Sequence, residues 1–98
     1  ECEAEAGTPA QAASYINEVR SRPCVKMPPV TLSSHDAAIK AVMHEYSVEF
    51  AGEERADVNI LRWRAKGYYP SIRPDPTPGQ VSLLPIPSIE TSANPLIK

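Results

Sequence analysis

The sequence predicts a mainly α-helical fold, with a helix pair in residues 1–22, two further helices in residues 33–67 and a long irregular tail in residues 68–98. Three observations support this prediction. A Gly-Thr-Pro triplet separates two helical segments near the amino terminus, apolar residues recur at helical spacing in the middle of the chain, and proline is concentrated in the last third. A chain of 98 residues has room for one small domain at most.

The turn between the first two helices is predicted from its capping residues. Gly7 can end a first helix in the left-handed conformation, Thr8 can cap a second helix, and Pro9 suits the first position of that helix. Gln11 completes a Thr-x-x-Gln capping box. Residues 1–6 give fewer than two turns, so we expect a shortened first helix that lies antiparallel to the second.

The second helix is expected to run to about Arg22, because Pro23 ends it. Arg20 and Arg22 lie in its last turn, where positive charge is favourable. Its apolar face is made of Ala12, Tyr15, Ile16 and Val19. Residues 23–32 contain two adjacent prolines, which predicts a connector that is not helical.

A third helix is expected to begin within residues 33–36, where the sequence SSHD offers capping side chains. Its apolar residues fall at helical spacing: Ile39, Val42, Met43, Tyr46 and Phe50. Gly52 marks the end of this helix or a kink in it. Such an apolar stripe must face another element of the fold.

A fourth helix is expected over about residues 54–66, with Ile60 and Trp63 on one side and Gly67 as its left-handed terminator. In the tail we expect no regular element except a helical turn near residues 88–92. A tail of this length and irregularity is uncommon inside a compact domain. Together with the shortened first helix, it leads us to expect that the chain is the carboxyl-terminal part of a larger α-helical protein, because such helix pairs stack in arrays.

Charge and hydropathy argue against two classes of partner. Ten basic and twelve acidic residues are interspersed and give a formal net charge of −2, so no field of one sign attracts nucleic acid. No apolar run approaches the roughly 20 residues that span a bilayer, and the acidic amino terminus is unlike a signal peptide. Cys2 and Cys24 flank a helix of roughly 20 Å, which disfavours a disulfide between them and leaves their state open.

The sequence contains no recognisable catalytic or metal-binding motif, and we expect no cofactor. His35 and His44 are nine residues apart, so they lack the one-turn spacing that brings two imidazoles to one metal ion. The chain also lacks a Gly-x-Ser-x-Gly elbow and a glycine-rich phosphate loop. We therefore interpret the two histidines as residues of a helix surface.

Three glutamates, Glu45, Glu49 and Glu53, recur every fourth residue. This repeat is unfavourable unless cations lie opposite. We interpret the glutamates as structural, paired with nearby arginines: Arg55, Arg62 and Arg64. A solvated face and a pair of carboxylates for acid–base chemistry are the alternatives, and the second would need a raised pKa in a cleft.

Aromatic residues near the fourth helix are the candidates for stacking on a ligand. Trp63 lies between Arg62 and Arg64 and could stack on a sugar ring or a base, although such a residue is more often a packing anchor. Tyr68 and Tyr69 follow the helix on an irregular segment, so we expect them to face solvent and ligand.

The order of motifs along the chain resembles one family. AASYINEVRSR is followed by EYSVEFAGEE, NILRW and LLPIPSIETSANP, and the residues that carry the match within these strings are 15–22, 45–53, 59–63 and 84–95. This order is similar to the carboxyl-terminal part of SusD/RagB proteins. Several residues depart from the family pattern. Tyr46 stands where Arg is usual, Glu54 where Gly is usual and Ala56 where Arg is usual. Asn59 stands where Asp is usual, and Pro23-Cys24 replaces the usual Ala-Gly. These departures imply a divergent member with a weakened Arg/Asp network.

The resemblance implies a fold of tetratricopeptide-like helix pairs in a protein several times longer than this chain. It implies a lipoprotein of the Bacteroidetes outer membrane that lies at the cell surface, anchored through a segment outside this chain. The protein would capture an oligosaccharide or another nutrient and deliver it to a SusC-like TonB-dependent transporter, without covalent chemistry. Much of the family's ligand platform lies in the remainder of the protein, so no residue here is assigned as ligand-binding.

Two other functions remain open. A helical-repeat module for protein–protein interaction agrees with the Gly-Thr-Pro helix pair. A small hydrolase would use Glu45, Glu49 or His44, and it would require turnover that Glu49→Gln abolishes in a folded protein. The identity of the ligand and the oligomeric state cannot be read from the sequence.

Overall fold

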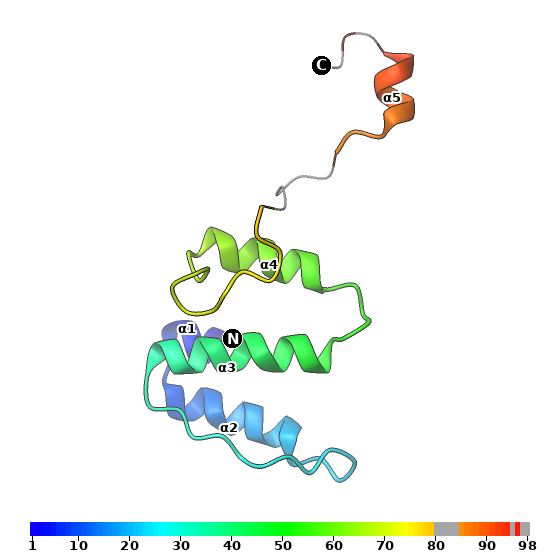
Figure 1. Ribbon diagram of the computed structural model, residues 1–98. Coiled ribbons are helices and arrows are strands. Elements are labelled where there is room, and N and C mark those ends of the chain that lie inside the picture. Colours follow the sequence, from blue (N-terminus) through cyan, green and yellow to red (C-terminus); the bar gives the residue numbers. More distant parts are fainter. Residues whose placement is uncertain (80–84, 95, 97–98) are drawn as a thin grey trace.

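The computed structural model describes residues 1–79, 85–94 and 96. The described residues form helices and no strands, which confirms the mainly α-helical class. The helices are α1 (Cys2–Ala6), α2 (Pro9–Arg20), α3 (His35–Glu49), α4 (Ala56–Ala65) and α5 (Ser88–Ala93). In Figure 1, α3 runs between α2 and α4, with α1 beside it. Only part of the expected LLPIP…NP ending, at residues 84–95, lies within the described residues.

Helices α1, α2 and α3 pack against one another around a small apolar core. The core residues from these helices include several alanines, which let the helix backbones approach closely: Ala4, Ala12, Ile16, Ala38, Ile39, Val42 and Met43. Ile39 and Met43 are fully buried. The apolar stripe predicted for α3 is therefore confirmed as its packing face.

The turn between α1 and α2 confirms the predicted cap and corrects the role of its glycine. Thr8 Oγ1 accepts a hydrogen bond from the Gln11 backbone N–H at 3.3 Å, as an N-cap should. Gly7 is not left-handed, because its φ is −104°. A Cβ on Gly7 would lie 1.9 Å from a carboxylate oxygen of Glu3, so glycine here allows a close approach to the preceding turn.

The predicted face of α2 is wrong at one position. Ala12 and Ile16 are buried, but Tyr15 is 55% exposed and Arg20 is 9% exposed. Arg20 follows Ile16 by four residues, so both side chains lie on the face toward α3. The buried arginine has acceptors there, and the phenol of Tyr15 is left at the surface.

The connector and the ends of α3 and α4 agree closely with the prediction. Residues 23–32 are not helical, and Ser34 caps α3 by accepting a hydrogen bond from the Ala37 backbone N–H at 3.2 Å. Gly67 follows α4 with a φ of +75°, the left-handed conformation expected of a helix terminator. α4 begins two residues later than predicted, at Ala56, and α5 confirms the helical turn expected in the tail.

The loop between α3 and α4 contains a second left-handed residue besides its glycine. Gly52 has a φ of +81°, which suits glycine, and Glu54 has a φ of +55°. Glu54 is one of the positions at which the chain departs from the SusD/RagB pattern, where glycine is usual. The departure therefore places a residue with a Cβ in a backbone conformation that favours glycine.

No helix among the described residues has both the length and the hydropathy needed to cross a membrane.

Two expectations about the domain organisation stay open. That the chain is the carboxyl-terminal part of a larger protein stays a prediction, as do the segment bounds 1–22, 33–67 and 68–98.

Candidate ligand-binding site

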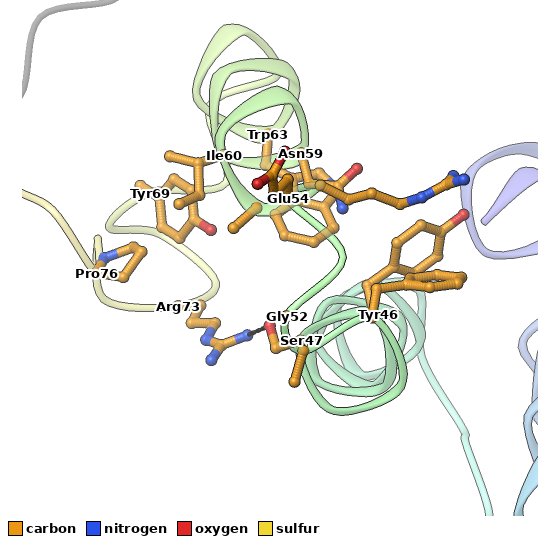
Figure 2. Close-up of a pocket in the computed structure, with 14 residues that line it drawn as sticks. Tyr46, Ser47, Gly52, Glu54, Asn59, Ile60, Trp63, Tyr69, Arg73 and Pro76 are labelled. Carbon is orange, nitrogen blue, oxygen red and sulfur yellow. Dashed lines mark hydrogen bonds between the residues drawn. The ribbon is translucent and has the colours of Figure 1, made fainter.

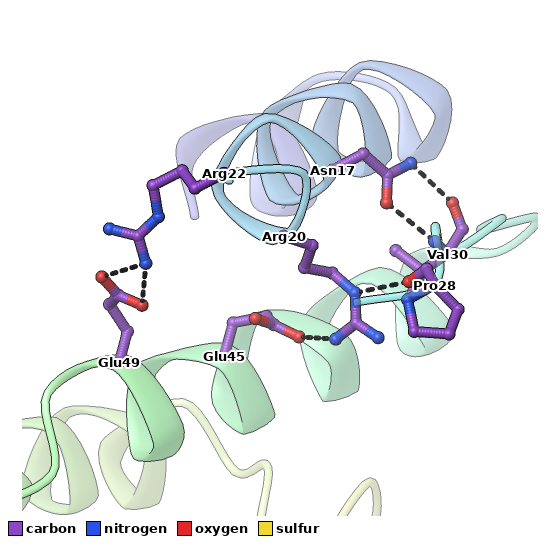
Figure 3. A network of polar contacts seen from close by, with 7 residues as sticks. All are labelled: Asn17, Arg20, Arg22, Pro28, Val30, Glu45 and Glu49. Atoms are coloured by element: carbon purple, nitrogen blue, oxygen red, sulfur yellow. Dashed lines mark hydrogen bonds and ion pairs between the residues drawn. The ribbon is translucent and has the colours of Figure 1, made fainter. Parts of the chain in front are cut away.

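Polar side chains join α2, the connector and α3 (Figure 3). Arg20 donates from Nε to the Pro28 carbonyl at 2.8 Å and from a terminal nitrogen to the Glu45 carboxylate. Asn17 forms two hydrogen bonds with the backbone of Val30, at 2.9 and 2.7 Å. The Arg20–Glu45 pair is largely buried, with side-chain exposures of 10% and 17%. These contacts fix the connector and α3 against α2.

A second ion pair lies one turn further along α3 and is open to solvent. Arg22 donates from one terminal nitrogen to both carboxylate oxygens of Glu49, at 2.8 and 2.7 Å. The side chains are 44% and 37% exposed. Water therefore screens this pair more strongly than the Arg20–Glu45 pair.

The glutamates are structural, as the sequence predicts, but two of the predicted partners are wrong. Glu45 and Glu49 pair with arginines of α2, because α2 packs directly on that face of α3. Glu53 lies beyond the end of α3 and approaches Arg55 at 3.8 Å, the one predicted partner that is confirmed. The other two predicted arginines have other partners, because Arg62 pairs with Glu1 and Arg64 pairs with Asp75.

Glu1, which precedes α1, binds α4. Its carboxylate accepts hydrogen bonds from Arg62 at 3.1 and 2.7 Å and from the Trp63 indole N–H at 3.3 Å. The Trp63 side chain is only 3% exposed, and Tyr46 packs edge-on against it at a centroid distance of 6.0 Å. Trp63 is therefore the packing anchor that the sequence favours: it lies in the wall of the cavity described below, but it leaves a ligand almost no ring surface to stack on.

Glu5 of α1 binds the end of α4 and the residue that follows it. It accepts a hydrogen bond from the Tyr68 hydroxyl and forms an ion pair with Lys66 at 2.9 Å. Burial raises the pKa of Glu5, but the hydrogen bonds from Tyr68 and Lys66 outweigh it, so the pKa lies below its usual value. Burial and the Glu5 carboxylate raise the pKa of Tyr68 to about 12. The expectation that Tyr68 faces solvent is wrong, because its ring is 8% exposed.

Arg64 fixes the chain segment that follows α4. Its guanidinium forms a two-pronged pair with Asp75 at 2.8 and 2.7 Å and also donates to the Thr77 hydroxyl at 2.8 Å. The hydrogen bond from Arg64 lowers the pKa of Asp75, and the same bond raises the pKa of Arg64. This contact returns the segment after α4 to that helix, and Tyr69, Arg73 and Pro76 of this returning segment (residues 68–79) build one wall of a cavity.

The cavity has a volume of about 340 Å³ and lies between the end of α3, the α3–α4 loop, α4 and the returning segment (Figure 2). A volume near 300 Å³ is at the low end of small-molecule sites. Partly buried aromatic rings from the end of α3 and from the returning segment line it: Tyr46, Phe50 and Tyr69. An apolar ring face could pack on these side chains.

Polar groups at the edge of the cavity could orient a ligand. Arg73 crosses from the returning segment to α3 and donates to Ser47 Oγ at 3.5 Å, as Figure 2 shows. Arg55 lies 5.3 Å from the centre of the Phe50 ring. Burial raises the pKa of Tyr69, so its hydroxyl stays protonated at neutral pH and can both donate and accept hydrogen bonds. The arrangement provides apolar surface with a few hydrogen-bonding groups, which suits binding.

The sequence missed most of this site. Tyr69 was expected to meet a ligand and does line the cavity, although it is half-buried. The contributions of Phe50 and Arg73 depend on how α3, α4 and the returning segment meet, so no local motif announces them. The one usable signal was helical spacing, which places Phe50 on the apolar stripe of α3.

The remaining candidate residues lie at the surface. His35 and His44 are exposed residues of α3, as predicted. Cys2 and Cys24 are free and exposed. Among the described residues, no group of three or more His, Cys, Asp or Glu side chains could hold a metal ion.

Comparison with known proteins gives one match. The family model described as the SusD family matches residues 1–82. No curated protein and no solved structure matches the chain.

Proposed function

The chain belongs to the SusD family, and on this premise we propose that the protein carrying it binds an oligosaccharide or another nutrient at the cell surface and delivers it to a TonB-dependent transporter. The family consists of nutrient-binding proteins. The match over residues 1–82 is the observation that carries the proposal. It includes the helices and loops that form the cavity described above.

The cavity supports a role in ligand binding. Its aromatic lining gives a surface for the apolar face of a sugar ring, and its polar rim gives hydrogen bonds for hydroxyl groups. Tyr69 and Phe50 are the ring contacts that we assign to the ligand. Arg73 and Ser47 are the polar contacts. The remainder of the protein would add the rest of the binding surface.

The location and partner of the protein follow from the same family membership. We infer a lipoprotein of the outer membrane, anchored through a segment outside this chain, with a SusC-like transporter as its partner. The proposed activity is capture and transfer, without a covalent step. The Arg20–Glu45 and Arg22–Glu49 pairs support this assignment, because the carboxylates that an acid–base mechanism would need are bound to arginines.

A binding experiment tests capture. The full-length protein is screened on a glycan array, and each hit is titrated by calorimetry. Tyr69→Ala is expected to weaken binding of the hit roughly tenfold, as loss of one stacking contact and one hydrogen bond would. Tyr15→Ala is the matched control, because Tyr15 is an exposed tyrosine outside the cavity.

Two outcomes would count against this assignment. Equal affinity in Tyr69→Ala and Tyr15→Ala would remove the cavity from the proposal. The absence of any saccharide or peptide hit would remove nutrient capture itself.

Delivery is tested separately by co-purification. The tagged protein, extracted from outer membranes in mild detergent, is expected to carry a TonB-dependent transporter in near-equal amount. Recovery of the protein alone, from membranes in which the transporter is present, would contradict the proposed partner.

A helical-repeat interaction module is the second candidate function. The packing of α1 and α2 as an antiparallel pair against α3 is the observation that favours it. It predicts a protein partner and no saccharide ligand, so the same array and co-purification distinguish the two functions.

A further inference from the structure

A second hollow, of about 460 Å³, shares Arg73 with the cavity and is lined by apolar side chains together with a group of basic ones. Arg20, Lys40, His44 and Arg73 surround it, and Glu45 is its one carboxylate. Glu45 is already paired with Arg20. The hollow therefore has a local excess of positive charge in a chain whose net charge is −2.

Arg20 gives this hollow a fixed donor. Its side chain is 10% exposed, and two of its nitrogens are bound, one to Pro28 and one to Glu45. The other terminal nitrogen has no hydrogen-bond partner among the described residues, and Figure 3 draws no bond from it. No fully buried side-chain nitrogen or oxygen in that part of the chain lacks a partner, so this nitrogen reaches the surface. It is a preoriented N–H donor that water or a ligand must satisfy.

Lys40 and His44 supply cationic or donor groups that have no acceptor within the described structure. Both are exposed and lie one turn apart on α3, so their side chains are neighbours. Two acids of the same helix flank these residues: Glu45, which is paired with Arg20, and Asp36, which contacts His35 at 3.4 Å. A ligand with negatively charged oxygens would find these groups unoccupied.

The hollow and the cavity are joined by one side chain. Arg73 lines both, and its hydrogen bond to Ser47 lays it across α3 between them. Lys40, His44 and Ser47 follow one another at helical spacing, so one face of α3 leads from the cationic hollow to the aromatic cavity. A ligand could therefore contact aromatic rings at one end and cations at the other.

We propose that the ligand is an acidic oligosaccharide, with a sugar ring in the aromatic cavity and a carboxylate or sulfate group bound by Arg73, Lys40 and Arg20 in the cationic hollow. This inference rests on the saccharide binding proposed above. Arg73 is the central contact, because a guanidinium can bind two oxyanion oxygens at once. Carboxylate and sulfate share this chemistry, so the ligand class is an oxyanion-bearing sugar.

Calorimetry with matched saccharides tests the inference on the full-length protein. The probes are trigalacturonic acid, its methyl ester, galactotriose and a sulfated galactotriose. The acid or the sulfated sugar is expected to bind at least tenfold more tightly than its neutral counterpart. This preference is expected to shrink as salt is raised from about 0.05 to 0.5 M, because salt screens partly exposed charges. The anion with the larger preference over its neutral counterpart shows whether the ligand's negative charge comes from a carboxylate or from a sulfate group.

Charge-removing variants locate the site. Lys40→Gln is expected to weaken binding of the acidic sugar about tenfold, while galactotriose binds as before. Arg73→Gln removes a contact to both sugars, so it is expected to weaken binding of galactotriose and to weaken binding of the acidic sugar more. Lys26→Gln is the matched control, because Lys26 is exposed and lies outside the hollow. This substitution removes the same charge as Lys40→Gln. Melting temperature is measured for each variant to show that it is folded.

Each outcome decides one proposal or both. Equal binding of acidic and neutral sugars, or equal effects of Lys40→Gln and Lys26→Gln, would overturn the acidic-ligand inference and leave saccharide capture standing. Failure of every saccharide to bind would overturn both.

Discussion

The body formed by α1, α2 and α3 and the region formed by α4 and residues 66–79 are stabilised by different interactions. In the body, small and branched apolar side chains pack directly between neighbouring helices. α4 contributes one large anchor, Trp63, and is otherwise attached by ion pairs to Glu1 and Glu5. The carboxylates come from the amino terminus and α1, more than sixty residues away from their hydrogen-bonding partners Trp63 and Tyr68.

This difference has a consequence for the candidate site. The cavity lies where the body meets the region of α4 and residues 66–79, between Phe50 at the end of α3 and Tyr69 of the returning segment. The cationic hollow lies at the α2–α3 contact of the body and also includes Arg73 of the returning segment. A ligand that touches both would therefore stabilise the less tightly packed region against the more tightly packed one.

The largest expected effect removes the anchor of α4. Trp63→Ala is expected to lower the free energy of unfolding by about 3–5 kcal/mol, because it deletes a buried aromatic ring and leaves a cavity. Urea unfolding of the full-length protein measures the loss, and hydrogen exchange should rise first in α4. Val58→Ala, at an exposed position of the same helix, is the control and should change little. Equal losses in the two variants would show that α4 does not depend on Trp63.

The next effect tests the body through its buried ion pair. Arg20→Met is expected to cost about 3 kcal/mol, because it leaves the Glu45 carboxylate mostly buried without a partner. The double variant Arg20→Met/Glu45→Leu should recover most of that loss, since no buried charge remains. Thermal and urea unfolding measure both. A double variant as unstable as the single one would contradict this account.

The neighbouring pair is the matched control for burial. Glu49→Gln removes the charge that faces Arg22 in an exposed pair, so the expected loss is below about 1 kcal/mol. A loss as large as that of Arg20→Met would mean that burial is not what separates the two pairs. An unchanged melting temperature would remove the structural role of Glu49.

An intermediate effect appears only at alkaline pH and concerns the contact between α1 and Tyr68. The pKa of Tyr68 is raised from 10.0 to about 12 in the folded chain, so the folded state retains the proton longer than the unfolded state. This contribution is full below about pH 10 and is lost as the pH rises through 12, at about 3 kcal/mol in total. Melting temperature should fall less steeply between pH 10 and 12 in Tyr68→Phe than in the parent protein.

Absorbance of the phenolate gives an independent reading of the same contact. Tyr68→Phe should remove the component that titrates near pH 12, while Tyr15→Phe, at an exposed tyrosine outside this contact, should leave that component in place. Identical titration curves for the two variants would show that Tyr68 is not shielded by Glu5.

The smallest expected effect is a gain at the loop that joins the two regions. Glu54→Gly should raise the free energy of unfolding by about 1 kcal/mol, because the left-handed conformation at φ +55° strains a residue with a Cβ. Glu53→Gly, at a neighbouring position without positive φ, should be slightly destabilising. Urea unfolding of both variants checks the sign, and a loss in Glu54→Gly would contradict the strain.

The sequence by itself determined the local structure of this protein. Thr8, Ser34 and Gly67 are capping or terminating residues whose effect depends on their immediate neighbours, so the helices they bound could be predicted to within a few residues. The spacing of apolar residues also determined the buried face of α3 and the anchoring role of Trp63. The family could be recognised because its motifs follow one another in order along the chain.

Only the tertiary structure decided which charges meet and where a ligand could bind. Glu45 pairs with Arg20 rather than with a later arginine because α2 packs against α3, and Tyr68 is buried because Glu5 of α1 reaches it. The cavity and the cationic hollow meet at Arg73, whose position is set by the returning segment. Such contacts join residues that are remote in sequence, and their geometry depends on the packing of several helices at once, which local propensity does not encode.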